Sequence, residues 1–493
     1  MQEREAKLSA PPDFTLPDLA DPAGGLVAEP LETRQFSTTY YDTPDLRLAR
    51  WGLSMRYRTG EGWTVKLEGE GQGPMLVREE LVFQAPANQP PSEALDLVRA
   101  FVRDSTLGPV ARLRTTRRPI ELRDQDGRAL GEVTDDRVAV MDGRRVSRRF
   151  REIEIELSAE APDDALDSVI KRLRAVGAEP VQVASKYLQA LGNPDPGPAE
   201  VVLQGLDGHA TVEELVRHDL GAAVLRLFRH DPIVRLGADP EGVHQARVAT
   251  RRFRSSLRTF RPTLEEGWTM RLREQAKWLA DRLGAARDAD VLQARLRGHL
   301  EELGEPDAES GGWLLKRLDR ERDAARAALL AAMRESSYVQ LLDELIAAAN
   351  SPMVLDGGQP AAKVLLPRVA STWRKLADEV RQAGPEPSDS QLHQIRIRAK
   401  RCRYAAEAVT PVAGKPAARF AAAVEAVQEV LGGQHDAVVA QDWLRRAAAD
   451  APGRAALTAG LLIAVERDAA ARARTEWEAA WDRLDRKKLR DWF

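Results

Sequence analysis

Short stretches within the first 192 residues alternate polar and apolar side chains with a period of two. Phe150-Arg-Glu-Ile-Glu-Ile-Glu-Leu157 is the clearest example, and 62–68, 78–83 and 112–114 repeat the pattern. This period predicts β-strands with one face turned toward a core. About eight such stretches, with helical patterns near 92–104 and 163–176, predict a closed eight-stranded antiparallel sheet with flanking helices.

After residue 200 the apolar positions recur every three or four residues, which is typical of amphipathic helices. A Pro/Gly-rich segment, Asn193-Pro-Asp-Pro-Gly-Pro-Ala199, stands between the two patterns, and neither helix nor sheet continues across such a segment. The sequence therefore predicts an α+β protein. We expect an N-terminal domain over 1–192, a Pro-rich linker over 193–200 and an all-α bundle over 201–493.

The helical part repeats itself. The segments 243–254 and 392–403 both place a histidine ahead of a row of Arg and Lys, at an offset of 149 residues. A second pair, 283–289 and 431–437, shares Leu-Gly and Asp-Ala at an offset of 148 residues. Two motifs at nearly one offset predict two copies of one helical unit, over about 205–340 and 360–493.

Composition narrows the class of protein. The net charge is −3, so no overall positive field indicates a nucleic-acid binder. The single cysteine, Cys402, excludes a disulfide framework and a cysteine-based metal site. The first residues lack an apolar signal core and no apolar run reaches about 18 residues, so we expect a cytoplasmic protein without a membrane span.

Two rows of acidic side chains stand out in the strand-rich part. Glu3, Glu5 and Lys7 alternate on one predicted strand, and Glu152, Glu154 and Glu156 alternate on another, so each row projects from one strand face. Carboxylate rows could hold a hard divalent cation through oxygen. The predicted strands between them carry the opposite charge, at Arg56, Arg58, Lys66, Arg78, Arg112 and Arg114, with Lys186 after the last acidic strand. Metal beside the acids and a polyanion beside the bases would neutralise these rows; a solvated face with cross-strand ion pairs is the alternative.

The order of these motifs resembles that of the CYTH family, the triphosphate tunnel enzymes, over nearly all of 1–192. The matching segments are Glu3-Arg-Glu-Ala-Lys7, Tyr40-Tyr-Asp-Thr43, Leu53-Ser-Met-Arg-Tyr-Arg58, Val65-Lys66, the cluster 112–118, Asp135-Asp136, Glu152-Ile-Glu-Ile-Glu156 and Ser185-Lys-Tyr187. The resemblance implies an eight-stranded tunnel that binds triphosphate with Mg²⁺ or Mn²⁺. The plainest activity is hydrolysis of inorganic triphosphate, with adenylyl cyclisation and thiamine triphosphate hydrolysis as alternatives.

The resemblance also implies roles for individual residues. The implied metal ligands are Glu3, Glu5, Asp136, Glu154 and Glu156. The implied phosphate-binding residues are Lys7, Arg56, Arg58, Lys66, Arg112, Arg114, Arg117 and Lys186. Catalysis would rest on Glu3, Glu5, Lys7, Glu154 and Glu156. Which arginines of the cluster 112–118 point inward stays open, because Arg117 has the opposite strand parity to Arg112 and Arg114.

In the helical part, cations align along two predicted helices. One stripe holds His244, Arg247, Arg251, Arg254 and Arg258, beside Arg252; the other holds His393, Arg396, Lys400 and Arg403, beside Arg401. No acidic residue lies between Glu241 and Glu265, so pairing within the first helix cannot neutralise its row. Such rows favour a polyanion, whereas salt bridges from Asp288, Asp290 or Asp436 are the alternative.

Both His/Arg motifs resemble the CHAD domain, which binds inorganic polyphosphate. His435 stands where the first copy has Arg287. The whole chain is thus expected to be a CYTH-CHAD protein whose ligands are inorganic triphosphate and polyphosphate, with no specific nucleic acid and a possible association with polyphosphate granules. The rival hypothesis is a non-enzymatic protein that binds polyphosphate and targets granules.

Overall fold

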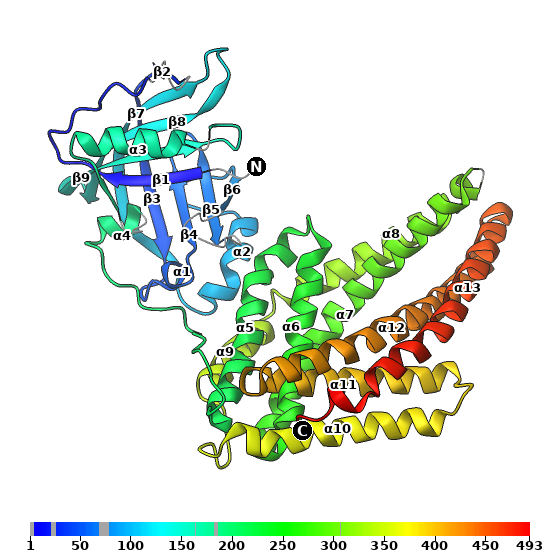
Figure 1. Cartoon of the computed structure of the whole chain (residues 1–493). Coiled ribbons are helices and arrows are strands. Elements are labelled where there is room, and N and C mark those ends of the chain that lie inside the picture. Colours follow the sequence, from blue (N-terminus) through cyan, green and yellow to red (C-terminus); the bar gives the residue numbers. More distant parts are fainter. Residues whose placement is uncertain (1–3, 21–25, 69–77, 163, 182–185, 306) are drawn as a thin grey trace. The chain divides into compact units, whose positions relative to one another are not determined.

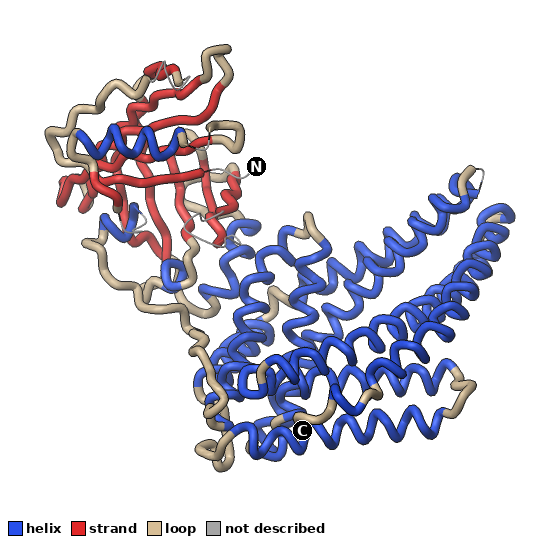
Figure 2. The backbone as a smooth tube through the Cα atoms, viewed as in Figure 1, coloured by secondary structure: helices blue, strands red, loops and turns tan. Residues whose placement is uncertain are grey.

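The computed structural model describes the chain except for residues 1–3, 21–25, 69–77, 163, 182–185 and 306. Contacts divide it into two compact units, Met1–Glu200 and Val201–Phe493. The first unit is built mainly of strands and the second of helices, as Figure 2 shows. None of the helices that the structure describes is long and apolar enough to cross a membrane.

A ten-stranded antiparallel sheet forms the first unit (Figure 1). Its strands are β1 (Arg4–Ser9), β2 (Val27–Pro30), β3 (Arg34–Asp42), β4 (Ser54–Arg58), β5 (Gly62–Glu68), β6 (Arg78–Phe83), β7 (Gly108–Arg123), β8 (Ala129–Asp142), β9 (Arg145–Leu157) and β10 (Glu179–Pro180). Their order is β10-β1-β9-β8-β7-β3-β4-β5-β6, and β2 pairs with β7. Among the described residues no ladder joins β6 to β1 or β10, so the predicted closure of the sheet is not seen. The expected strand number of eight is exceeded because β2 and β10 add short strands.

One face of the sheet is apolar and covered. Four short helices accompany the strands: α1 (Arg47–Arg50), α2 (Ser92–Val102), α3 (Ala165–Ala175) and α4 (Lys186–Ala190). Ile153, Ile155 and Leu157 of β9 are buried in a core cluster that also contains Val169 and Leu173 of α3. Since side chains alternate along a strand, the acidic residues between those of β9 project from the other face.

Nine α-helices form the described part of the second unit (Figure 1). They are α5 (Val212–Leu236), α6 (Pro240–Thr259), α7 (Glu266–Leu303), α8 (Asp307–Ala332), α9 (Ser336–Asn350), α10 (Ala361–Ala383), α11 (Asp389–Ala413), α12 (Lys415–Asp450) and α13 (Gly453–Leu484), with the short 3-10 helices η1 (Arg261–Thr263) and η2 (Lys487–Leu489). Leu296, Leu318, Trp443 and Leu462 share one core, which joins the α7–α8 pair to the α12–α13 pair.

Local sequence sets where several of these helices begin. Thr211 and Glu214 form a capping box at the start of α5, and Ser388 and Gln391 form another at the start of α11. Each satisfies backbone N–H groups that the first helical turn would otherwise leave unpaired. At the start of α6 the side chain of Asp239 accepts one hydrogen bond, from the backbone N–H of Glu241. The ends of α6 and α11, which carry the predicted cationic rows, are therefore fixed by local hydrogen bonds.

Candidate functional site

Charged side chains from β1, β4, β5, β7, β8 and β9 share the face of the sheet opposite α3; we call this the charged face. Strand register places Glu5 opposite Glu156 and Lys7 opposite Glu154. On the neighbouring strands Asp136 lies opposite Glu152 and Arg117 opposite Asp136. Residues directly opposite one another in an antiparallel pair point to the same face, so the described members of the two acidic rows meet there.

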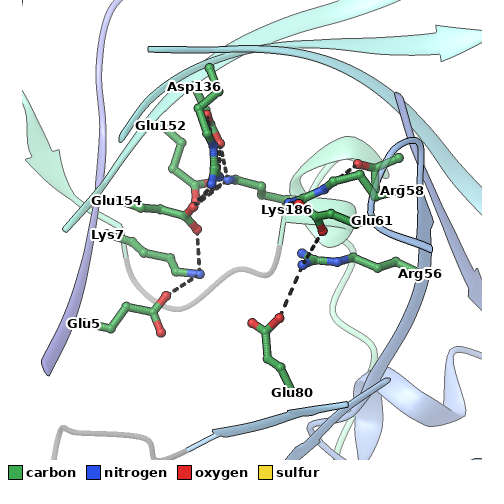
Figure 3. A network of polar contacts seen from close by, with 12 residues as sticks. Glu5, Lys7, Arg56, Arg58, Glu61, Glu80, Asp136, Glu152, Glu154 and Lys186 are labelled. Carbon is green, nitrogen blue, oxygen red and sulfur yellow. Dashed lines mark hydrogen bonds and ion pairs between the residues drawn. The ribbon is translucent and has the colours of Figure 1, made fainter. Parts of the chain in front are cut away.

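The acidic part of the charged face is a continuous network of ion pairs, shown in Figure 3. The Lys7 Nζ atom lies 2.7 Å from Glu5 and 2.9 Å from Glu154. Lys186, at the start of α4, donates to Glu154 at 2.8 Å and to Asp136 at 2.5 Å. Arg117 donates twice to Asp136, at 2.8 and 2.7 Å, in a bidentate pair.

These contacts decide the charge of the buried groups. Burial acts to raise the pKa of Glu154, but Lys186 and Lys7 hold it well below its ordinary value. Likewise Lys186 and Arg117 overcome the effect of burial and lower the pKa of Asp136. Burial acts to lower the pKa of Lys186, and Glu154 with its acidic neighbours raises it instead. Each of these side chains is therefore charged at neutral pH.

The remaining two carboxyls of β9 behave differently. Burial raises the pKa of Glu152 to about 7, and the negative charge of Glu154 adds to the rise. The pKa of Glu156 is also raised, first because the surrounding protein partly removes water from the carboxyl group and then because of the charges of Glu154 and Glu5. Part of this side chain nevertheless remains accessible to solvent. Negative charge is thus in excess around Glu156, and a nearby cation would stabilise its ionised form.

The donor types at this end fit Mg²⁺ or Mn²⁺, since Glu5, Glu154 and Glu156 offer carboxylate oxygens to a hard cation. In the described ranges no three acidic, histidine or cysteine side chains converge as a metal cluster. Glu3, one of the expected ligands, lies outside the described residues. The fit therefore rests on donor chemistry and on the burial and the repulsion by Glu154 and Glu5 that together raise the pKa of Glu156.

The basic part of the charged face lies on β4 and β5. Arg56 and Arg58 are largely buried there, and strand register puts Lys66 on the same face. Arg58 donates to Glu61 at 2.6 Å, Arg56 lies 3.4 Å from Glu80, and Lys66 forms a close ion pair with Glu80. Two carboxylates of the chain thus neutralise these three cations in part.

An aromatic ring connects the two parts. Phe36 of β3 lies under the guanidinium of Arg58, 4.4 Å from the ring centroid, and that of Arg117 lies 5.6 Å away. Both distances permit cation–π attraction, which orients the two arginines. Phe36, Glu61 and Glu80 were not anticipated from the sequence. Glu80 could have been identified from the pairing of β5 with β6, because that register places Glu80 opposite Lys66.

Arg112 and Arg114 do not join the charged face. Both are exposed, and strand alternation puts them on the face of β7 opposite to Arg117. The register confirms this, because Arg117 rather than its even-numbered neighbours faces Asp136. The expectation that Arg112 and Arg114 clamp phosphate is corrected accordingly.

In the second unit the two predicted cationic rows come together where α6 packs against α11; we call this the cationic helix pair. Burial lowers the pKa of Lys400 to about 7, and the positive charges of Arg396, Arg251 and Arg247 add to the effect. The lowered pKa of Lys400 indicates that positive charge is in excess at this part of the cationic helix pair.

A second cluster continues along the same helices. Burial lowers the pKa of Arg258 to about 10, with further contributions from Arg401, Arg273 and Arg254. Arg273, on α7, was not anticipated. Within the described part of the chain, five buried guanidinium Nε atoms of the two clusters have no hydrogen-bond partner: those of Arg251, Arg254, Arg273, Arg396 and Arg401. Unpaired buried donors of this kind suit an anionic ligand.

Salt bridges account for the remaining predicted cations. Arg403 pairs with Glu407 at 2.6 Å and with Glu425 at 2.7 Å. Arg252 lies 3.5 Å from Asp219 and 3.6 Å from Glu407. The partners of these two arginines are not the acids that the salt-bridge alternative named. Of those acids, Asp288 lies 3.2 Å from Arg247.

The histidines that head the two rows are uncharged at neutral pH. Burial, followed by neighbouring arginines, lowers the pKa of His244 and that of His393. The ring of His393 lies 4.6 Å from that of His435, centroid to centroid, and the pKa of His435 is lowered in the same way. The three rings therefore contribute no charge to the cationic helix pair at neutral pH.

Comparison with known proteins matches a different family to each part of the chain. Residues 1–188 match the CYTH domain and residues 218–445 match the CHAD domain. The uncharacterized protein Rv2226 of Mycobacterium tuberculosis is 32% identical over 520 residues, which cover 99% of this chain and 98% of that protein. Among solved structures, PptA from Streptomyces chartreusis is 22% identical with a TM-score of 0.48, covering 55% of this chain and 100% of that chain. The CHAD domain from the plant Ricinus communis is 27% identical with a TM-score of 0.47, covering 59% and 96%.

Proposed function

Because the chain belongs to the family in which a CYTH domain is followed by a CHAD domain, we propose that its first unit hydrolyses inorganic triphosphate and that its second unit binds inorganic polyphosphate. The charged face supports the first part of the proposal. Three partly neutralised cations, Arg56, Arg58 and Lys66, lie on the same face as the acidic network around Glu154. We further propose that the sheet closes into a tunnel around this face.

Triphosphate would bind to the basic part of the charged face. Its oxygens would replace Glu61 and Glu80 as partners of Arg56, Arg58 and Lys66, because phosphate accepts more charge-assisted hydrogen bonds than a carboxylate does. Lys186 and Arg117, held by Asp136, would then carry positive charge toward the phosphoryl group that is transferred. Water adds to a terminal phosphorus and diphosphate leaves, so the products are phosphate and diphosphate.

Glu5, Glu154 and Glu156, with Asp136 and Glu3, would hold Mg²⁺ or Mn²⁺. When bound, such a metal neutralises phosphate oxygens and lowers the pKa of water. The residues of the chain contribute position and charge. Lys7 keeps Glu5 and Glu154 within reach of one another through its two ion pairs, and the cations of β4 and β5 hold the substrate for in-line attack.

A matched pair of arginine variants tests this assignment. Arg58→Gln removes a cation from the charged face, whereas Arg112→Gln removes an exposed cation that projects from the opposite side of β7. A hydrogen bond to a charged group contributes about 1.5–3 kcal/mol, so Arg58→Gln should lower kcat/KM for triphosphate by roughly ten- to one-hundred-fold. Arg112→Gln should leave it unchanged. Equal effects of the two variants would contradict the placement of the substrate.

For the second unit, the supporting observation is the pair of successive cation clusters on α6 and α11. One cluster centres on Lys400 and the other on Arg258, so an extended polyanion could contact both. We also propose that α5–α8 and α10–α13 are the two copies indicated by the sequence repeat. Binding of this kind would place the protein on polyphosphate granules.

Salt dependence provides the test. Each cation that contacts a polyanion releases a condensed counterion, so affinity falls steeply as salt rises. Arg396→Gln should weaken polyphosphate binding and reduce the slope of log affinity against log salt by about one. The control is Arg398→Gln on the same helix, because Arg398 is paired with Glu379 at 3.0 Å. Salt-insensitive binding, or equal binding of single-stranded DNA of the same charge, would contradict the proposal.

A further inference from the structure

A second cationic site lies apart from the cationic helix pair. A cavity of about 410 Å³ opens between α12, the end of α13 and η2. Arg419 of α12 and Arg483 of α13 line it, together with Arg486 and Lys488 from the turn that follows. The residues beyond Asp450 that line it fall outside the segment that matches the CHAD domain, 218–445.

The four cations make no side-chain contacts with acidic groups in the part of the chain that the structure describes. Among the described residues, no side-chain hydrogen bond or ion pair involves Arg419, Arg483, Arg486 or Lys488, and no carboxylate lines the cavity. Arg483 lies in the last turn of α13, where the helix dipole favours a cation, so it needs no ligand. No such reason applies to Arg419, which lies near the amino end of α12 in a helix whose first turn has no acidic residue.

The rest of the lining is apolar and unusually small. Ala423 and Ala426 of α12 and Ala480 of α13 form a wall of small side chains, which we call the alanine wall, and Trp492 lies in the same lining. The indole N–H of Trp492 donates to the Leu489 carbonyl at 3.0 Å, and its ring centroid lies 4.8 Å from that of Phe493. The ring is therefore held in place rather than free to turn into the cavity.

A concave site of this volume, with apolar walls and a few convergent charges, has the character of a small-molecule site. Four cations around one cavity favour a ligand with several negative charges, and the alanine wall with a fixed indole suits a flat ring. We propose that this cavity binds a nucleoside triphosphate, with its base against the alanine wall and Trp492 and its phosphates on the four cations. Two compounds separate these contributions to binding. Inorganic triphosphate has the negative charge but no ring, and adenosine has the ring but no negative charge.

The experiment measures binding of radiolabelled ATP to the full chain by equilibrium dialysis. Excess inorganic triphosphate and long-chain polyphosphate are present, so that the charged face and the cationic helix pair are occupied. We expect one ATP site to remain, and adenosine to compete poorly for it. Complete displacement of ATP by inorganic triphosphate would overturn the proposal, because the cavity would then bind any ligand with enough negative charge and would not recognise the base.

Two changes at the cavity should remove this site. The double variant Arg419→Gln/Lys488→Gln lowers its charge, and Ala426→Trp fills the space against the wall; each should weaken ATP binding at least tenfold. Arg472→Gln, which removes an exposed cation of α13 that does not line the cavity, is the matched control and should bind as the unaltered chain does. Thermal melting identifies a variant that fails to fold, and the double variant alters only exposed side chains. Undiminished ATP binding by the folded double variant would refute the proposal.

Discussion

Lys400 should make polyphosphate binding depend on pH, and replacing it by arginine should remove that dependence. Its amino group faces Arg396 on its own helix, Arg247 and Arg251 on α6, and the carboxylate of Asp436 on α12. Burial and the three arginines lower its pKa from 10.5 to about 7, against a smaller opposing effect of Asp436. A bound polyanion would supply the missing negative charge and raise the pKa again.

The sign and size of the effect follow from proton linkage. Above pH 7 the free protein has mostly lost the Lys400 proton, so binding requires proton uptake and affinity falls as pH rises. The protonated fraction of a group with a pKa of about 7 falls from about one half at pH 7 to about one hundredth at pH 9. If the bound lysine stays charged, affinity should fall by roughly fiftyfold over this interval. His244, His393 and His435, whose pKa values are lowered, stay neutral throughout it.

The assay is fluorescence anisotropy of labelled long-chain polyphosphate, titrated at constant ionic strength from pH 7 to pH 9. Lys400→Arg keeps a cation that does not titrate in this range, so its affinity should stay nearly constant. Lys400→Met should also be insensitive to pH, and as weak throughout as the unaltered chain is at pH 9. The reasoning is refuted if the unaltered chain and Lys400→Arg lose affinity equally between pH 7 and pH 9.

Three further predictions concern the first unit. Glu156→Gln should raise the Mg²⁺ concentration needed for half-maximal triphosphate hydrolysis without lowering the melting temperature, because its carboxylate is solvent-accessible; an unchanged metal requirement would remove it from the ligand set. Glu80→Gln should lower KM for triphosphate, measured by phosphate release, since it frees Lys66 from its ion pair; a raised KM would show that Glu80 assists binding instead. Asp135→Ala leaves the buried Arg151 without its bidentate partner and should cost about 3–5 kcal/mol of unfolding free energy in urea titrations. Because that pair lies on the face opposite the charged face, activity per folded molecule should persist, and its loss would argue against a purely structural role.

Strand periodicity was sufficient to predict which acids share a face. Glu152, Glu154 and Glu156 alternate with residues that α3 covers, and backbone geometry alone fixes that alternation. Strand periodicity could not decide whether Arg117 or its neighbours point to the charged face, because the cationic cluster of β7 has arginines at both odd and even positions. The register against Asp136, which depends on packing between distant segments, decides it. The counter-charges Glu61 and Glu80 are local instead: Glu61 stands three residues after Arg58, and Glu80 lies opposite Lys66 on the next strand, so sequence spacing could have indicated both.

The helical wheel predicted the cationic rows of α6 and α11 but not how they are neutralised. Arg403 stands four residues before Glu407, a spacing that favours an ion pair and is visible in the sequence. The partner of Arg247 is Asp288 of α7, one of three acids that the sequence offered, and one helix alone could not select it. The depressed pKa of Lys400 likewise depends on burial and on α6, so only the packed structure reveals it.

Phosphate release by the purified chain tests the central claim most directly. Inorganic triphosphate, ATP and long-chain polyphosphate are each incubated with Mg²⁺, with Mn²⁺ or with a chelator, and phosphate, diphosphate and cyclic AMP are measured. The proposed function predicts metal-dependent conversion of triphosphate into phosphate and diphosphate, faster than turnover of ATP or polyphosphate and without cyclic AMP. Polyphosphate binding without hydrolysis of triphosphate under any of these conditions would contradict it and would identify the chain as a binding protein.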